Sequence, residues 1–185
     1  RSDLYDMFQE SPRVLVPRHR RLEITERVDA TGTVVIPLDE SEIPGLIEEL
    51  KDLDVEAVAI SLLFSFLNDH HERRLGDALR EVLPDVAIFL SSEVLPEVRE
   101  FERTSTTAVC AYVAPILKSY LERLETATNS LGLPDLHVMG STGGVFDVRE
   151  ALRMPVNSVE SGPAAGVIAT QLVGVQLGET NLISF

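Results

Sequence analysis

The feature that most limits the fold is an alternation of helical and apolar segments between residues 38 and 90. Two segments, one opened by residues 38–41 and one capped by Asn68 or Asp69, place their apolar residues on one side of a helix. Each is followed by a nearly continuous apolar run, at residues 57–64 and 86–90, which is typical of a strand buried on both faces. The alternation predicts an α/β fold with a mainly parallel or mixed sheet and flanking helices.

The segments on either side of this unit have different patterns. Residues 14–16 and 33–36 read as extended stretches, the second after a turn at Thr31-Gly32. Residues 91–107 alternate in charge and predict a polar connector. A long helix then carries a wide apolar stripe from Val109 to Leu124, and Pro115 inside it predicts a kink or break near Val113.

The last third of the chain is predicted to be strand, loop and helix in turn. A strand at 136–139 runs into a loop of small residues at 140–144. Asp147 and Glu150 have the spacing of a capping box for a short helix, and residues 156–159 read as extended. Gly162 suits the N-cap of a further helix, whose small residues at 164–169 allow another backbone to approach closely. Residues 181–185 read as the start of a strand.

Composition excludes several classes of protein. The formal charge is −14, which repels phosphate backbones, so nucleic acid is not expected as a partner. The single cysteine, Cys110, forms no intramolecular disulfide, which fits a cytoplasmic location, and no apolar run is long enough for a membrane span. The chain lacks an initial methionine and ends within a strand-like run, so we expect it to be part of a longer protein.

A set of motifs, in order along the whole chain, resembles the hydantoinase A/5-oxoprolinase family, which includes the N-methylhydantoinases. The motifs are Leu4-Tyr5-Asp6, Glu26-Arg27-Val28, Pro37-Leu38-Asp39, His71-Glu72, residues 102–107 (ERTSTT), residues 111–115 (AYVAP), residues 139–144 (MGSTGG) and residues 161–167 (SGPAAGV). Each motif is weak alone, and their ordered combination is fairly specific.

The resemblance implies a fold that the residues alone do not establish. It places the chain in the actin/Hsp70/sugar-kinase ATPase superfamily, whose ribonuclease H-like fold has two α/β domains around a nucleotide cleft. Residues 1–95 would be the C-terminal part of the N-terminal α/β domain. Residues 96–185 would hold the connector, the long helix and the start of the hydantoinase A/oxoprolinase domain. The two phosphate hairpins would lie before Arg1 and after Phe185.

ATP and Mg²⁺ are the implied cofactors of the full-length protein. The chain itself contains neither an Asp-x-Gly-Gly-Thr stretch nor a Gly-x-x-x-x-Gly-Lys-Ser/Thr stretch. We therefore expect the 185 residues alone to lack a complete ATP site and to be inactive.

The implied activity is the ATP-dependent hydrolysis of a cyclic amide such as hydantoin or 5-oxoproline. A hydantoinase B-type subunit or a fused domain would be the partner, and the isolated chain is expected to self-associate through exposed apolar surface. Two alternatives stay open: the ATP-using subunit of an acetone- or acetophenone-type carboxylase, and a non-catalytic interaction module.

Two stretches are the main candidates for lining the cleft. In the first, Ser141, Thr142, Gly143 and Gly144 follow a strand, a position where ligands often bind in open α/β sheets; the alternative is a tight turn. In the second, Glu160, Ser161 and Gly162 open a helix whose free N–H groups favour anions; the alternative is ordinary capping.

Other polar residues give weaker signals, and no residue is assigned a catalytic role. Arg103 could bind an anion, or pair with Glu100 or Glu102 at a helix start. His70-His71-Glu72 lacks the spacing of a metal site, so no metal is predicted. Cys110 is predicted to be an unreactive residue that packs in the interior.

Four positions depart from the family pattern. Phe64 stands where relatives often have histidine, Cys110 where they have asparagine, and Gly140 and Thr142 where they have glutamine and asparagine. The substrate is therefore left open between hydantoin, 5-oxoproline and other compounds.

Overall fold

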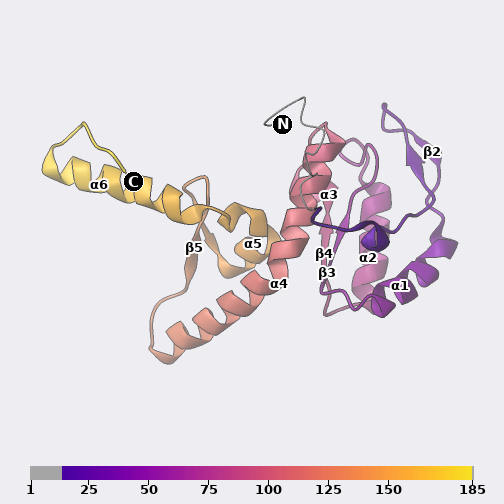
Figure 1. Cartoon of the computed structure of the whole chain (residues 1–185), viewed down its shortest axis with the longest axis horizontal. Coiled ribbons are helices and arrows are strands. Elements are labelled where there is room, and N and C mark those ends of the chain that lie inside the picture. The colour runs from indigo at the N-terminus through magenta and orange to yellow at the C-terminus, as the bar shows by residue number, and fades with distance from the viewer. Residues whose placement is uncertain (1–13, 185) are drawn as a thin grey trace, which may run out of the picture.

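The computed structural model describes residues 14–184, which form an α/β structure with three separate two-stranded sheets (Figure 1). The motif at Leu4-Tyr5-Asp6 lies outside the described residues. The strands are β1 (Arg27–Val28), β2 (Val34–Ile36), β3 (Ala57–Ile60), β4 (Ala87–Leu90), β5 (His137–Met139) and β6 (Val145–Asp147). The α-helices are α1 (Ile43–Asp52), α2 (His70–Val82), α3 (Ser91–Val94), α4 (Glu100–Ser130), α5 (Val148–Arg153) and α6 (Ser161–Leu177), with 3-10 turns η1 (Arg18–Arg20), η2 (Glu40–Glu42) and η3 (Pro155–Ser158).

The predicted helix–strand alternation is confirmed in the first half of the chain. β3 and β4 pair in parallel, from Ala57↔Ala87 to Ile60↔Leu90, with α2 as the crossover. Leu90 belongs to a buried cluster shared with α1 and α2, whereas Phe89 belongs to one shared with α3 and α4. Because alternate residues of a strand point to opposite faces, α1 and α2 cover one face of the pair and α4 the other.

The prediction of a mainly parallel sheet holds only for β3 and β4. β1 with β2 and β5 with β6 are antiparallel hairpins, and within residues 14–184 none of the three pairs joins another. Gly32 and Gly143, at φ 82° and 87°, supply the left-handed positions that these two hairpin loops use.

Several local predictions were wrong, and at 91–107 the burial of polar side chains explains the difference. The polar connector predicted at 91–107 forms α3 and the first turns of α4, where Ser91, Arg103 and Thr107 are buried. The stretch at 14–16 is a bend, the stretch at 156–159 lies mostly in η3, and residues 181–184 form no strand.

The long helix α4 is continuous from Glu100 to Ser130 although Pro115 lies inside it. The predicted break is therefore absent, while Figure 1 shows the helix changing direction between its halves, as a proline that removes one backbone hydrogen bond would cause. The first half packs on β3 and β4, and the second half extends away from them toward the strand β5.

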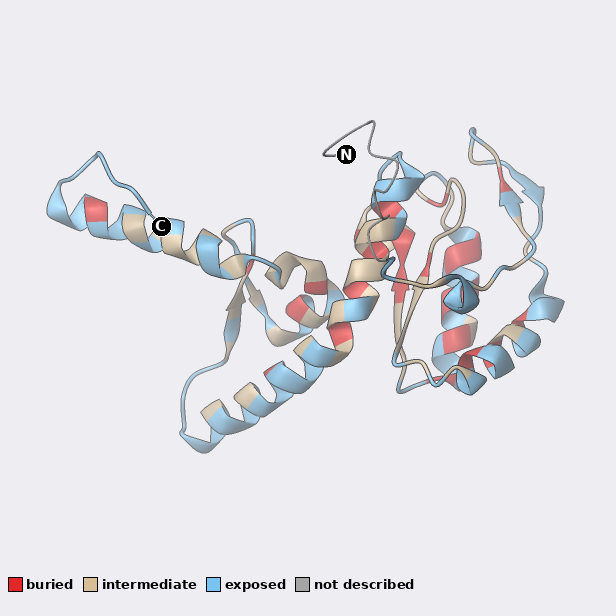
Figure 2. Ribbon diagram, viewed as in Figure 1, coloured by how far each residue is buried: buried red, intermediate tan, exposed pale blue. Residues whose placement is uncertain are grey.

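Exposure differs between the two parts of the molecule (Figure 2). Buried residues concentrate around β3, β4, α2 and the first half of α4, whereas α6 is largely exposed. Val167, Leu172, Val175 and Leu177 of α6 leave more than half of their surface accessible. Self-association of the isolated chain thus stays a prediction, which sedimentation velocity over a range of concentrations would check.

No helix within residues 14–184 has the length and apolar character needed to cross a membrane.

The predicted capping box is present at the start of α5, and removing it should weaken the fold. Glu150 N–H donates to Asp147 Oδ1 at 2.8 Å, and Asp147 N–H donates to Glu150 Oε2 at 3.3 Å. Asp147→Ala should lower the free energy of unfolding by about 1 kcal/mol, because a first-turn N–H loses its acceptor. Urea denaturation checks this, with Asp85→Ala, an exposed aspartate, as the control. Equal losses in both variants would contradict the role of the cap.

Candidate functional site

The loop of small residues at 140–144 is the tip of the β5–β6 hairpin. Gly140 N–H donates to Gly144 O at 2.7 Å, and Gly143 N–H donates to Gly140 O at 3.0 Å. A Cβ at Gly140 would overlap the Phe146 ring, so the close packing of that ring explains the glycine.

The loop was predicted to connect a strand directly to a helix, and β6 corrects this. β5 pairs with β6 as an antiparallel neighbour, so the loop does not lie at the carboxyl edge of a parallel sheet. The argument that placed a ligand crevice there by topology therefore does not apply. Any ligand contact must come from the local geometry of the loop and of the elements that pack on it.

Gly143 and Gly144 are adjacent, but only Gly143 has a backbone conformation and surroundings that favour glycine. Substituting each in turn therefore tests this difference. Gly143 has φ 87°, and an added Cβ would lie 3.0 Å from Ile168 Cδ1; a Cβ at Gly144 would meet open space. Gly143→Ala should lower the free energy of unfolding by about 1–2 kcal/mol, because alanine is strained at positive φ. Gly144→Ala should change it by less than about 0.5 kcal/mol. Thermal denaturation of both variants checks this, and similar midpoints would contradict the assignment.

The two predicted stretches meet around a shallow crevice. Ser141 N–H donates to Asn157 O at 2.7 Å, which ties the hairpin to η3 just before α6. A cavity of about 510 Å³ lies between them, and its lining residues are Ser141, Val156, Val159, Glu160, Pro163, Ala164 and Val167. The structure thus brings Ser141 and Glu160 together at one crevice. Thr142, Gly143, Gly144, Ser161 and Gly162 adjoin it in sequence without lining it.

The N-terminus of α6 contributes to this crevice. Glu160, not the expected Gly162, is the N-cap, and it has a left-handed backbone conformation at φ 59°. Ser161 and Gly162 fall in the first turn, where helices leave N–H groups without intrahelical partners. The crevice therefore combines the carboxylate of Glu160 and the hydroxyl of Ser141 with a mostly apolar wall, and the first-turn amides of Ser161 and Gly162 lie next to it in sequence.

The described residues do not form a complete binding site for a magnesium nucleotide. The N–H groups of Gly140, Ser141 and Gly143 are already donated to protein carbonyls, which leaves few loop amides for a phosphate. Within residues 14–184 no three histidine, cysteine, aspartate or glutamate side chains gather where they could hold a metal ion. We therefore derive no catalytic step through ATP or Mg²⁺ from these residues.

Arg103 lies apart from the crevice. Its side chain is buried, with 1% of its surface accessible, and it donates to Ser91 Oγ, Glu97 O and Leu62 O at 3.1, 3.2 and 2.8 Å. The guanidinium also lies over the Phe66 ring, 5.3 Å from its centre. The expected ion pair with Glu100 or Glu102 does not form, because the side chain points toward Leu62, Phe66 and Ser91.

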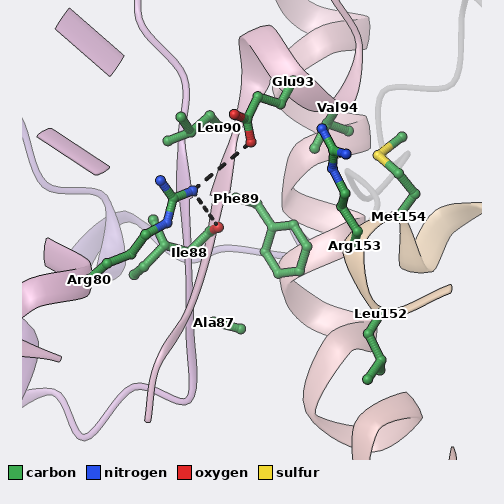
Figure 3. Close-up of a pocket in the computed structure, with 10 residues that line it drawn as sticks. All are labelled: Arg80, Ala87, Ile88, Phe89, Leu90, Glu93, Val94, Leu152, Arg153 and Met154. Carbon is green, nitrogen blue, oxygen red and sulfur yellow. Dashed lines mark hydrogen bonds and ion pairs between the residues drawn. The ribbon is translucent and has the colours of Figure 1, made fainter. Parts of the chain in front are cut away.

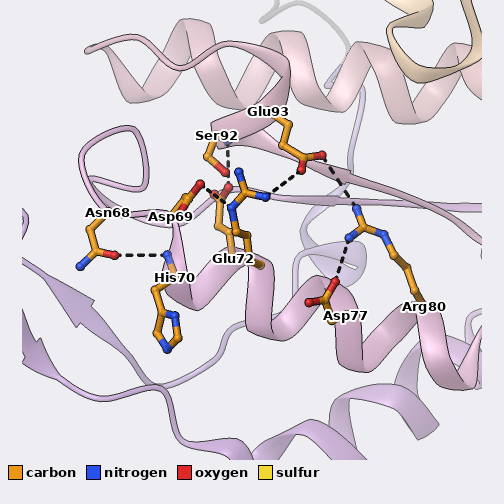
Figure 4. Close-up of polar contacts among 9 residues, drawn as sticks. Asn68, Asp69, His70, Glu72, Asp77, Arg80, Ser92 and Glu93 are labelled. Atoms are coloured by element: carbon orange, nitrogen blue, oxygen red, sulfur yellow. Dashed lines mark hydrogen bonds and ion pairs between the residues drawn. The ribbon is translucent and has the colours of Figure 1, made fainter. Parts of the chain in front are cut away.

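Arg103 belongs to a buried network that the sequence did not indicate. Glu72 is fully buried and accepts hydrogen bonds from Leu62 N–H at 2.8 Å, Ser91 Oγ at 2.6 Å and Ser92 N–H at 2.9 Å. Figure 4 draws the contact with Ser92. Ser91 Oγ also accepts from Arg103 Nε, so one hydroxyl connects two buried charges of opposite sign. The network joins α2, α3, α4 and the segment after β3.

Two further residues singled out in the sequence have structural roles. His71 Nδ1 lies 2.8 Å from Glu26 Oε2 in a largely buried pair, while Glu72 points to the network above, so the three residues at 70–72 do not converge. Cys110 is fully buried against β4, as the prediction of inert packing required, and burial raises the pKa of its thiol.

A second cavity of about 490 Å³ follows β4 and holds none of the predicted site residues (Figure 3). All four β4 residues line it, with Val94, Leu152 and Met154 completing an apolar wall. At its rim Arg80 donates to Ile88 O at 3.4 Å and lies 4.0 Å from Glu93. Because Arg80 already donates a hydrogen bond to a backbone carbonyl of β4 at this cavity, we assign the cavity no function.

Known proteins match the chain along nearly its whole length. The family model for the hydantoinase/oxoprolinase N-terminal region matches residues 1–83, and the hydantoinase/oxoprolinase model matches residues 103–185. Caprolactamase subunit alpha from Pseudomonas jessenii is 36% identical over 97% of the chain and 26% of its own length.

Two solved structures are similar in fold and sequence. The crystal structure of the ATP-dependent caprolactamase from Pseudomonas jessenii has a TM-score of 0.86 and 37% identity over 97% of the chain and 26% of its own. Nucleotide-free acetone carboxylase, from work on ATP-dependent acetone carboxylation, has a TM-score of 0.78 and 32% identity over 91% and 24%. The chain spans about a quarter of the length of these relatives. Both family models, in the expected order and with only residues 84–102 between them, show that the chain belongs to the hydantoinase/oxoprolinase family.

Proposed function

We propose that this chain is part of an ATP-dependent hydrolase that opens a small cyclic amide such as hydantoin, 5-oxoproline or caprolactam. The observation that carries the proposal is the similarity to an ATP-dependent caprolactamase, at 37% identity and a TM-score of 0.86 over 97% of the chain. A likeness at this identity extends beyond a shared fold, and both halves of the chain take part in it.

The finer architecture belongs to the same proposal. We take the parent protein to have an actin-like, two-domain ATPase fold, with residues 1–95 in the first domain and 96–185 in the second. The long helix α4 supports a link between them, because its first half packs on β3 and β4 and its second half leads to the β5–β6 hairpin. Several relatives are subunits of larger enzymes, which supports a partner such as a B-type subunit or a fused domain.

For the site, we propose that the crevice at Ser141 and Glu160 contacts the substrate or the nucleotide. Thr142, Gly143, Gly144, Ser161 and Gly162 would shape it through their backbone. The mostly apolar wall suits the hydrocarbon part of a small cyclic amide, and a few polar groups suit its amide. Among the residues that the structure describes, Glu160 is the one titratable residue lining the crevice, so no acid–base pair is assigned there and the catalytic residues stay unassigned.

The experiment that tests the function uses the full-length protein with its partner subunit. We expect ATP hydrolysis to rise when hydantoin, 5-oxoproline or caprolactam is added, with ring-opened product formed in step. A rise with acetone and bicarbonate instead would favour the carboxylase alternative, which the similarity to acetone carboxylase supports. No stimulation by any of these compounds would favour an interaction module and overturn the proposal.

The 185-residue chain alone is proposed to hydrolyse no ATP and to bind it weakly, since its loop amides are mostly committed and it lacks a phosphate-loop motif. Isothermal titration calorimetry with ATP and Mg²⁺ tests this. Tight, Mg²⁺-dependent binding would contradict it.

A further inference from the structure

Phe64 has a backbone conformation that bulky residues rarely adopt. Its φ is 57°, and it stands third in a turn in which Ser65 N–H donates to Leu62 O at 3.4 Å. Glycine or asparagine normally takes that position. The other described non-glycine residues with positive φ are Asp54, of a type that tolerates it, and Arg99 and Glu160, which directly precede α4 and α6. Phe64 is the only aromatic residue among these four, and a bulky side chain makes this conformation especially unfavourable.

The surrounding structure imposes this conformation from several sides. The backbone of Leu62 is held between the buried charges, because its N–H donates to Glu72 and its carbonyl accepts from Arg103. Ser65 Oγ lies 3.1 Å from Ser91 Oγ, and Ser61 Oγ lies 2.7 Å from Thr104 Oγ1. Residues 61–67, which we call the anchored loop, are therefore fixed by contacts from α2, α3 and α4.

The anchored loop follows β3 at the carboxyl end of the parallel pair. In open α/β sheets, ligands bind outside the carboxyl ends of the strands. The loop is mostly apolar, Leu63, Phe64 and Phe66 are partly accessible, and Leu67 is exposed. The Phe64 and Phe66 rings are 6.2 Å apart and tilted, so they form a small aromatic surface.

We propose that the anchored loop is a second ligand contact, separate from the crevice at Ser141, and that Phe64 determines specificity for the ring of a small cyclic amide. The substrate class rests on the proposed function. Backbone strain persists where structure over-determines it, and such residues cluster at ligand sites. Glycine would relieve the strain at Phe64 but would remove the aromatic face that would pack on the planar amide group of the ring. Glu72 and Arg103 act as positioning residues for the loop.

The first test needs no activity and uses the 185-residue chain. Phe64→Ala removes the ring but keeps the strain, whereas Phe64→Gly removes both. The glycine variant should melt about 2–4 °C above the alanine variant, because glycine adopts positive φ without a steric cost. An equal or lower midpoint for Phe64→Gly would overturn the proposal, since the backbone would then be unstrained.

The second test measures the KM for the cyclic amide in the full-length enzyme with its partner subunit. Phe64→Ala and Phe64→Gly should raise the KM at least about tenfold, and Phe64→Tyr, which keeps the ring, should restore it. Phe101→Ala is the matched control, because Phe101 is 79% exposed on α4 outside the loop, and its KM should equal that of the wild type.

The outcomes separate the two proposals. An active wild type with an unchanged KM in Phe64→Ala would overturn the role of Phe64 alone. Weaker assembly with the partner subunit at an unchanged KM would also overturn it, because Phe64 would then contact protein. A wild type inactive on hydantoin, 5-oxoproline and caprolactam would overturn the proposed function and, with it, the substrate assigned to Phe64.

Discussion

Replacing Glu72 by alanine is expected to lower the free energy of unfolding by about 3–5 kcal/mol. The change leaves the N–H groups of Leu62 and Ser92 and the Ser91 hydroxyl without their acceptor. It also removes the carboxylate that Ser91 Oγ links to the buried Arg103 guanidinium. Each loss is costly in the interior, where water cannot replace the missing partner. Urea denaturation of the 185-residue chain, followed by circular dichroism, measures the effect.

Two further variants make this result interpretable. Glu72→Gln keeps an oxygen acceptor and the side-chain size but loses the charge, so it should cost less than Glu72→Ala and remain folded. Glu122→Ala removes an exposed glutamate of α4 and should change stability by no more than about 0.5 kcal/mol. If Glu72→Ala behaved like Glu122→Ala, the network would not stabilise the fold as described.

Arg103→Ala is expected to cost about 3–5 kcal/mol as well, for the complementary reason. The substitution removes three donated hydrogen bonds and the packing of the guanidinium on Phe66, and it removes the positive charge that Ser91 Oγ links to the buried Glu72. Arg123→Ala, on the exposed side of the same helix, is the control and should stay within about 0.5 kcal/mol of the wild type.

The double variant tests whether Glu72 and Arg103 act as one unit. Combining Glu72→Gln with Arg103→Ala should cost less than the sum of the single losses, by about 1–3 kcal/mol, because both charges leave together. The measurement is the same denaturation series. Strict additivity would mean that the two side chains stabilise the fold independently, and that the shared Ser91 hydroxyl transmits no coupling.

The candidate site was only partly predictable from the sequence. The small residues at 140–144 and the opening of α6 stand out by their glycines, and the structure places Ser141 and Glu160 at one crevice. The hairpin was missed because β6 spans only three residues, with no alternation long enough to be recognised. Phe64 gave no local signal of its conformation, because a turn with positive φ is usually recognised by glycine or asparagine.

The sequence by itself determined the elements whose signal is local. Apolar periodicity defined α1 and α2, the two apolar runs located β3 and β4, and the spacing of Asp147 and Glu150 located the cap of α5. Only the tertiary structure shows which polar residues are buried. Glu72, Ser91 and Arg103 look like solvated surface in a sequence, yet they are buried because their partners come from four different segments. A hydrogen bond between residues far apart in sequence leaves no pattern in either segment, so only the folded chain shows it.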